Sequence, residues 1–197
     1  MGGVARAGAV RDRARGRSGR TPLFVVSLLA AAAASSSPAA AADLTCANAS
    51  ASPAHLSTTA ARHSLLCLVN RVRGAHGLRA LRPEPRLLRA ATGHAADMVS
   101  LEYFDHDGPD GTLTSRVRAT GYLRHTRRWR LGEALAWGRG RTGTPRGLLA
   151  SLMASPPHRA LLLDAGFREL GLGLAHGSPQ GPGAAALTLT LDFGRRG

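Results

Sequence analysis

The stretch Leu187-Thr188-Leu189-Thr190-Leu191-Asp192-Phe193 alternates apolar and polar side chains along its whole length. Alternation with a period of two is typical of a strand that buries one face, so we expect a half-buried antiparallel strand over residues 186–193. Two further strands are expected over residues 128–137 and 169–175. The last of these includes Gly171-Leu172-Gly173, which no third glycine and helix follow, so a phosphate-binding loop is not indicated.

Helices are expected before these strands and between them. A first helix is predicted from Thr58 to Ala75, with Gly77 just beyond its end. Its apolar residues have the i, i+3, i+4, i+7 spacing of one helical stripe: Leu65, Leu68, Val69 and Val72. Cys67 lies off this stripe, where a preceding tail could reach it.

A second helix is predicted from about residue 84 to Leu101. Its packing face comprises residues at helical spacing: Leu87, Ala91, His94, Met98 and Leu101. Shorter helices are expected over residues 115–120, over 146–154, and directly after Ser155. Helices followed by mixed strands and helices indicate an α+β fold in a single layered domain.

The N-terminus has the composition of an export signal. Five arginines within residues 11–20 precede an apolar stretch over 23–34, and an Ala-x-Ala cleavage motif ends at Ala42. An apolar stretch of about 12 residues is shorter than the roughly 20 needed to span a membrane, which favours a cleaved signal over a permanent transmembrane anchor. The chain is therefore expected to have three parts: a signal peptide over 1–42, a tail over 43–56 and one domain over 57–194.

The chain has two cysteines, Cys46 and Cys67, and both follow the predicted signal. In the oxidising surroundings of a secreted or cell-envelope protein they are expected to form a disulfide. Closing a loop of about 20 residues would stabilise the fold by roughly 3 kcal/mol. The alternative, two buried free thiols, suits a cytosolic protein.

The net charge is +14 at pH 7, and all 26 basic residues are arginines. A basic surface attracts anionic polymers, including nucleic acid. The arginines are scattered, however, and two Trp, two Tyr and four Phe provide few rings on which bases could stack. A solvated basic face is the favoured interpretation, and specific nucleic-acid binding is not indicated.

Five short motifs follow one another through the C-terminal half of the chain: Tyr103-Phe104-Asp105-His106, Gly132-Glu133, Ser155-Pro156-Pro157-His158-Arg159, Gly171-Leu172-Gly173 and Asp192-Phe193-Gly194. In this order they resemble the CAP superfamily (cysteine-rich secretory proteins, antigen 5 and pathogenesis-related-one proteins) in its compact bacterial form. The resemblance covers roughly residues 60–194. It implies an α-β-α sandwich, in agreement with the α+β pattern, and it implies that distant motifs meet in one cleft.

The cleft of that family holds two histidines and two glutamates. By motif, His106 and His158 resemble the histidines and Glu133 resembles the first glutamate. The second glutamate has no counterpart, because Ser155 stands near its position. Ala134 also replaces the asparagine that usually follows Gly-Glu in the family.

Two interpretations of this cluster stay open. Two neutral imidazoles and one carboxylate are suitable ligands for zinc or another divalent cation, with one coordination position left free. Alternatively, His106, Glu133 and His158 form a hydrogen-bonded cluster that organises the loops, because buried polar groups need partners. Both interpretations place the three side chains close together, and the missing glutamate removes a candidate general base.

Three neighbouring features have structural interpretations. His94, on the packing face of the second helix, is expected to be a hydrogen-bonded structural histidine. Ser155, followed by Pro156, is expected to cap a helix rather than to act as a nucleophile with His158 as its base. Residues 105–111 lack the ligand spacing and terminal glutamate of a calcium loop, so we expect a turn that presents His106.

The favoured function is that of a secreted, monomeric, non-catalytic CAP-domain protein. It would bind a cell-envelope component, a lipid or a peptide in the His/Glu-lined cleft. The alternative is a divalent-metal-dependent hydrolase that uses the same cleft. A third hypothesis, a basic binder of polyanions or nucleic acid, lacks a recognised binding motif.

Overall fold

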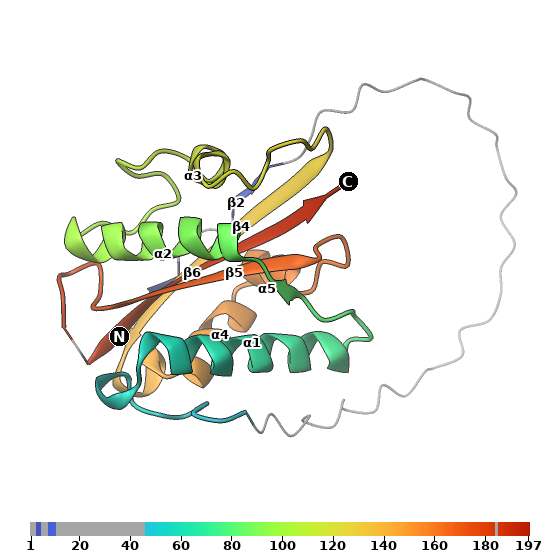
Figure 1. The fold of residues 1–197 in the computed structure, drawn as a ribbon. Coiled ribbons are helices and arrows are strands. Elements are labelled where there is room, and N and C mark those ends of the chain that lie inside the picture. Colours follow the sequence, from blue (N-terminus) through green and yellow to red (C-terminus); the bar gives the residue numbers. More distant parts are fainter. Residues whose placement is uncertain (1–2, 5–7, 11–45, 184) are drawn as a thin grey trace, which may run out of the picture.

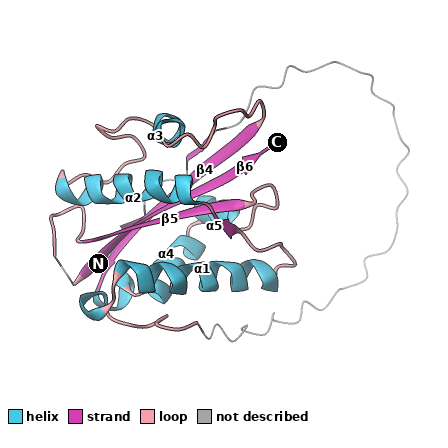
Figure 2. Cartoon of the chain, in the orientation of Figure 1, coloured by secondary structure: helices cyan, strands magenta, loops and turns pink. Residues whose placement is uncertain are grey.

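The computed structural model describes residues 3–4, 8–10, 46–183 and 185–197. The apolar stretch and the cleavage motif of the predicted signal lie outside these residues. A central sheet is covered by helices on both faces (Figure 1, Figure 2). This arrangement is the α-β-α sandwich that the sequence predicts.

Five α-helices and two short 3-10 helices lie within the described residues: α1 (Thr58–Ala75), α2 (Pro85–Ser100), α3 (Leu113–Ala119), α4 (Pro145–Ala154), α5 (Pro156–Leu162), η1 (Pro53–His55) and η2 (Gly140–Gly143). Side chains cap four of the α-helices. Ser57, Glu84, Thr112 and Thr144 each accept hydrogen bonds from backbone amides of the first turn. These contacts satisfy amides that have no partner inside the helix, and they fix where each helix begins.

The sheet has the order β1-β4-β6-β5-β3, and β2 also pairs with β4. Its strands are β1 (Gly3–Val4), β2 (Gly8–Val10), β3 (Arg82–Pro83), β4 (Trp129–Arg139), β5 (Glu169–His176) and β6 (Ala186–Arg196). All pairs are antiparallel except β3 with β5. In the central pair Glu133 lies opposite Asp192, so two acidic residues meet in the middle of the sheet.

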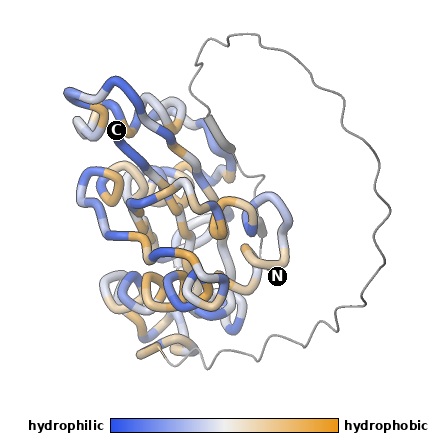
Figure 3. Tube along the Cα trace, turned by 90° about the vertical axis from the view of Figure 1, so that its right-hand side faces the viewer, coloured by the Kyte–Doolittle hydropathy of each residue, from blue (hydrophilic) through white to orange (hydrophobic). Residues whose placement is uncertain are grey.

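Two apolar clusters fill the spaces between the layers. The larger cluster lies between the sheet and α1, α4 and α5, and includes Leu65, Leu148 and Phe193. The smaller cluster lies between the opposite face and α2 and α3, and includes Leu87 and Val117. Figure 3 shows the apolar residues of these elements in orange, interspersed with polar ones.

The helix α2 lies directly on β5. A Cβ atom at Gly171 or Gly173 would overlap the α2 backbone at Leu87 and Ala91. Close packing therefore requires glycine at these two positions. It also holds α2, and His94 with it, against the sheet.

Two expectations about burial are wrong. Leu101 does not belong to the packing face of α2, because the helix ends at Ser100 and Leu101 is 54% exposed. The strand β6 is not half-buried either. Thr188, Thr190 and Asp192 are fully buried, because α2 covers the face of the sheet that they occupy.

A disulfide joins Cys46 to Cys67, as the sequence predicts. It ties the segment before η1 to the middle of α1. No helix in the part of the chain that the structure describes is long and apolar enough to cross a membrane.

Candidate functional site

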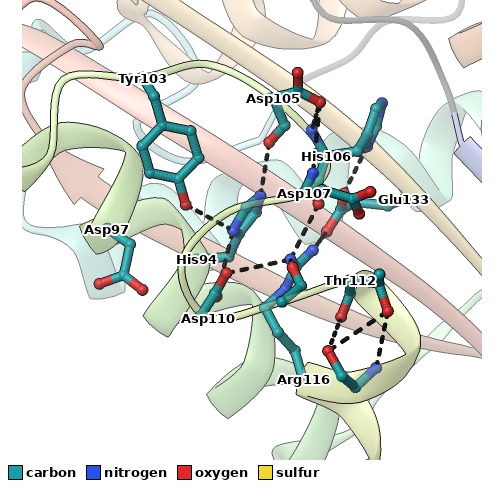
Figure 4. Close-up of polar contacts among 12 residues, drawn as sticks. His94, Asp97, Tyr103, Asp105, His106, Asp107, Asp110, Thr112, Arg116 and Glu133 are labelled. Atoms are coloured by element: carbon teal, nitrogen blue, oxygen red, sulfur yellow. Dashed lines mark hydrogen bonds and ion pairs between the residues drawn. The ribbon is translucent and has the colours of Figure 1, made fainter.

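The loop between α2 and α3 carries His106, and His94 holds this loop in place (Figure 4). The His94 Nε2 donates to the carbonyl oxygen of Asp105 at 2.9 Å, and the Tyr103 hydroxyl donates to His94 Nδ1 at 3.3 Å. Because a carbonyl oxygen can only accept, Nε2 carries a proton, and Nδ1 also lies 3.4 Å from Asp110 Oδ2. His94 is thus the hydrogen-bonded structural histidine that the sequence predicts.

The segment around His106 is a turn. The Asp105 carboxylate accepts a hydrogen bond from the His106 amide at 2.6 Å, and Gly108 and Gly111 pair across the turn. Gly111 has a φ of 90°, a conformation that favours glycine. Aspartate and glycine therefore have the turn-forming roles that the sequence predicts in place of a calcium loop.

Glu133 occupies the centre of the site, in the middle of β4, and has no exposed surface. His106 Nδ1 donates to Glu133 Oε2 at 2.6 Å, and Arg116 Nη2 donates to Glu133 Oε1 at 2.5 Å. Burial on its own raises the pKa of Glu133, but the hydrogen bond from His106 and the charge of Arg116 outweigh it and hold the pKa below its usual value. Glu133 is therefore ionised, and both of its oxygens are engaged.

Arg116, on α3, fastens the loop to the sheet. Its Nη1 donates to the carbonyl oxygens of His106 at 3.0 Å and of Gly111 at 2.7 Å, while its Nη2 pairs with Glu133 (Figure 4). The Arg116 side chain is only 3% exposed. A buried guanidinium needs a charged partner and hydrogen-bond acceptors. Glu133, Asp110 and the loop carbonyls supply these to the two Nη atoms, while Arg116 Nε has no partner within the described residues.

Asp192 lies beside Glu133 on β6 and is fully buried. Neither of its oxygens accepts a hydrogen bond from a donor within the described ranges. Burial and the negative charge of Glu133 raise the pKa of Asp192 well above its usual value. Burial and the neighbouring charge therefore favour the protonated, neutral form of Asp192.

The second histidine, His158, lies on α5 and contacts Ser155. The distance from His158 Nδ1 to Ser155 Oγ is 2.8 Å. Ser155 stands at the N-cap position before Pro156, but its hydroxyl makes no capping bond, so the predicted side-chain cap is wrong. The reason is the i, i+3 spacing, which places the imidazole within reach of the hydroxyl.

His158 is neutral at pH 7. Burial, and to a lesser degree an electrostatic effect of His106, lower the pKa of His158 to about 4. The structure brings His106 into contact with Glu133, whereas the hydrogen-bonding partner of His158 is Ser155.

The two histidines supply the nitrogen donors that a metal ion could use. The Nε2 atoms of His106 and His158 are buried and have no hydrogen-bond partner within the described ranges. The Glu133 carboxylate orients His106 from the other side of the ring, as carboxylates do behind metal-binding histidines. Both Glu133 oxygens are already bound, however, and among the residues that the structure describes no three His, Cys, Asp or Glu side chains are arranged to hold a metal ion.

An apolar groove lies apart from these residues. It has a volume of about 220 Å³ and is lined by side chains of α1, the start of α2 and β5. Its apolar lining residues are Leu66, Leu88, Leu170 and Leu172 together with Pro83 and Pro85, and Arg62, His63 and Glu84 also line it. The groove is a second place where a ligand with an apolar part could bind.

Sequence reasoning did not identify Arg116 or a role for Asp192 in this site. Nothing near Arg116 distinguishes it from the other arginines of the chain. The sequence does single out Asp192, because this acidic residue stands between Leu191 and Phe193 on a predicted strand.

Comparison with known proteins identifies the family of this chain and similar folds. The model of the cysteine-rich secretory protein family (CAP) matches residues 66–191. The uncharacterized protein YkwD of Bacillus subtilis (strain 168) is 29% identical over 118 residues, which cover 59% of this chain and 43% of that protein.

Solved structures show the same fold. An extracellular protein containing an SCP domain from Bacillus anthracis superposes with a TM-score of 0.54 at 24% identity, over 70% of this chain and 43% of that one. An outer surface protein from Borrelia burgdorferi superposes with a TM-score of 0.59 at 18% identity, over 72% of this chain and 97% of that one. The chain spans less than half the length of the two Bacillus proteins.

The fold and the site together define a class of domain. It is an α-β-α sandwich with a buried His–Glu contact beside its central sheet. The family match covers more than half of the chain. The chain belongs to the cysteine-rich secretory protein (CAP) family.

Proposed function

We propose that this chain is an exported CAP-domain binding protein whose ligand contacts the Nε2 atoms of His106 and His158. The observation that carries the proposal is that both atoms are buried without a hydrogen-bond partner in the described part of the chain. Buried polar atoms normally have partners, so a ligand that supplies them would gain affinity and selectivity at this position. A polar group of a cell-envelope component or of a peptide has the required chemistry.

A binding role fits these residues better than catalysis does. Glu133 is ionised but fully engaged by His106 and Arg116, so it is poorly placed to accept a proton from a substrate. Ser155 and His158 are in contact, as a nucleophile and its base would be. A residue that orients the base is lacking among the described residues, because no side chain or backbone group binds the Nε2 atom of His158.

Export is supported by three observations. The N-terminal sequence has the pattern of a signal peptide, and the disulfide between Cys46 and Cys67 is typical of oxidising compartments. Of the similar solved structures, one is an extracellular protein and the other an outer surface protein.

A lipid ligand would use the groove described above, since an acyl chain needs apolar walls. Its volume of about 220 Å³ suits one short chain, and Arg62 would place a positive charge near a carboxylate or phosphate head. This groove gives the lipid alternative a location of its own, separate from the two histidines.

The test is a defined ligand panel followed by NMR of the histidine ring resonances. Soluble muropeptides, short peptides and a fatty acid would be added separately to the protein and to a His106→Asn/His158→Asn variant. We expect one class to shift the His106 and His158 resonances and to bind at least about tenfold more weakly to the variant, the loss that one hydrogen bond produces. Binding that leaves both resonances unchanged would contradict the proposal.

A divalent cation is the second candidate ligand, because imidazole nitrogens oriented by a carboxylate are suitable for zinc. Calorimetric titration of zinc into the metal-stripped protein tests this candidate, with His106→Ala/His158→Ala as the control. Stoichiometric binding that the variant loses would support a metal site. An undiminished zinc response in the variant would exclude these two histidines as its ligands.

A further inference from the structure

The outer edge of β4 is paired with the N-terminal end of the same chain. Along its inner edge, β4 pairs with β6 over its full length. Along the outer edge, Gly3–Val4 lies antiparallel opposite Ala136–Trp137. Gly8–Val10 lies antiparallel opposite Leu131–Glu133, with Gly8 opposite Glu133. Figure 1 shows β2 running alongside β4 at this edge.

The sequence of β4 leaves this edge open to strand addition. Natural edge strands avoid pairing with other chains by being short or by carrying proline, lysine or a bulge. The eleven residues of β4 contain neither proline nor lysine, and their register with β6 is unbroken. Its one inward-pointing charge, Glu133, is paired with Arg116. Such a strand presents a regular row of backbone donors and acceptors to an extended segment.

We propose that the outer edge of β4 is a strand-docking site, and that the chain's own N-terminal segment occupies it until the leader is removed. Residues 3–4 and 8–10 are the occupants that the structure records. These residues belong to the predicted signal peptide, so cleavage would open the edge. The leader would then act as a cover for the edge as well as an export signal.

The register places this docking site beside the candidate functional site. Gly8 lies opposite Glu133 on the outer side, just as Asp192 lies opposite it on the inner side. Residues directly opposite one another in neighbouring strands project to the same face of a sheet. A docked strand with a side chain at the position opposite Glu133 would therefore project that side chain to the same face as the Glu133 side chain.

Cross-linking in the full chain tests the register. In Gly3→Cys/Trp137→Cys the two cysteines are directly opposite, about 4.5–5.5 Å apart at Cα, which a disulfide can bridge. In the control Gly3→Cys/Arg139→Cys the second cysteine is two residues along the same face, about 7–8 Å away. We expect most molecules of the first variant to cross-link and few of the second. Equal cross-linking in both, or none in the first, would overturn the proposal.

Hydrogen exchange provides a measurement that does not depend on new cysteines. A specific protease site inserted between Ala42 and Cys46 allows the folded full chain to be cut and the leader to be removed. We expect the outward amides of β4 to exchange about tenfold faster or more after cutting, with β5 unchanged. A synthetic peptide of residues 1–12 should restore the protection, and the same peptide with Val4→Pro and Ala9→Pro should not. Unchanged exchange after cutting, or equal protection by the proline peptide, would overturn strand docking.

Discussion

Asp192 lies directly opposite Glu133 in the β4–β6 pair, and both carboxyl groups are fully buried. Two buried carboxylates side by side would repel each other strongly, so the pair divides into one ion and one neutral acid. Arg116 and His106 select Glu133 as the ion, because both donate to it. Asp192 keeps its proton, and its pKa is raised well above the usual value.

Asp192→Asn should make stability less dependent on pH. Because the pKa of Asp192 is raised in the folded state, the stability that its protonated form contributes is complete below the usual Asp pKa of about 4 and is lost as pH rises through the raised pKa. Asparagine stays neutral. The melting temperature of the variant, relative to the native protein, should therefore rise between pH 5 and pH 8. If the melting temperatures of the two proteins change in parallel with pH across this range, Asp192 is already ionised at pH 5.

His158 should titrate far below an ordinary histidine. Its pKa is lowered to about 4, whereas an unfolded histidine titrates near about 6.5. As pH falls through this window the unfolded chain takes up the proton first, so stability is lost toward acid pH. His158→Gln should remove that loss. The ring resonance of His158 in an NMR titration gives the midpoint directly, and a midpoint near 6.5 would refute the burial argument.

His94→Ala should release the His106 loop. The substitution leaves the Asp105 carbonyl and the Tyr103 hydroxyl without their partner, at a cost of about 2–3 kcal/mol. The backbone amides of residues 103–111 should then exchange faster with solvent. The exposed His63 on α1 provides the control, and His63→Ala should leave the loop unchanged. Destabilisation by His94→Ala without faster exchange in the loop would mean that Arg116 alone holds it.

Cys46→Ser/Cys67→Ser should lower the free energy of unfolding by roughly 3 kcal/mol, because the bridge closes a loop of 21 residues. Urea denaturation measures the loss, and the native protein in reducing buffer should show a similar one. The cap of α1 by Ser57 and the core cluster remain, so the fold should persist. A difference below about 1 kcal/mol would indicate that the unfolded chain is already compact in this region.

The sequence predicts the helices and strands well where the signal is local. The predicted bounds of α1, Thr58–Ala75, agree with the structure because an apolar stripe and the Ser57 cap act together. Burial depends on what the rest of the chain places nearby. Leu101 fits the stripe of α2 but lies one residue beyond its end, and Thr188 is buried only because α2 covers β6.

The site was predicted only through resemblance to a family. His106 and Glu133 are 27 residues apart, and no local spacing indicates that they meet. Arg116 lies on a third element, and one arginine among many gives no signal. Asp192 could have been recognised, because an acid that alternates with buried leucines on a strand must find a way to lose its charge or to pair it.

The most direct test of the central claim is thermal unfolding of Glu133→Gln with and without zinc, with Glu102→Gln at the start of the same loop as the exposed control. We claim that Glu133 holds the site together. Removing its charge takes away the buried counter-ion of Arg116 and leaves only the partly exposed Asp110, 3.4 Å from Nη1. Breaking a buried ion pair costs about 3–5 kcal/mol. Because the pKa of Glu133 is lowered, this contribution is present above about pH 4.3 and is lost as pH falls further. At pH 7 we predict the same large drop in melting temperature whether or not zinc is present. An unchanged melting temperature without zinc, together with loss of a stabilisation by zinc, would contradict this claim and identify Glu133 as a metal ligand.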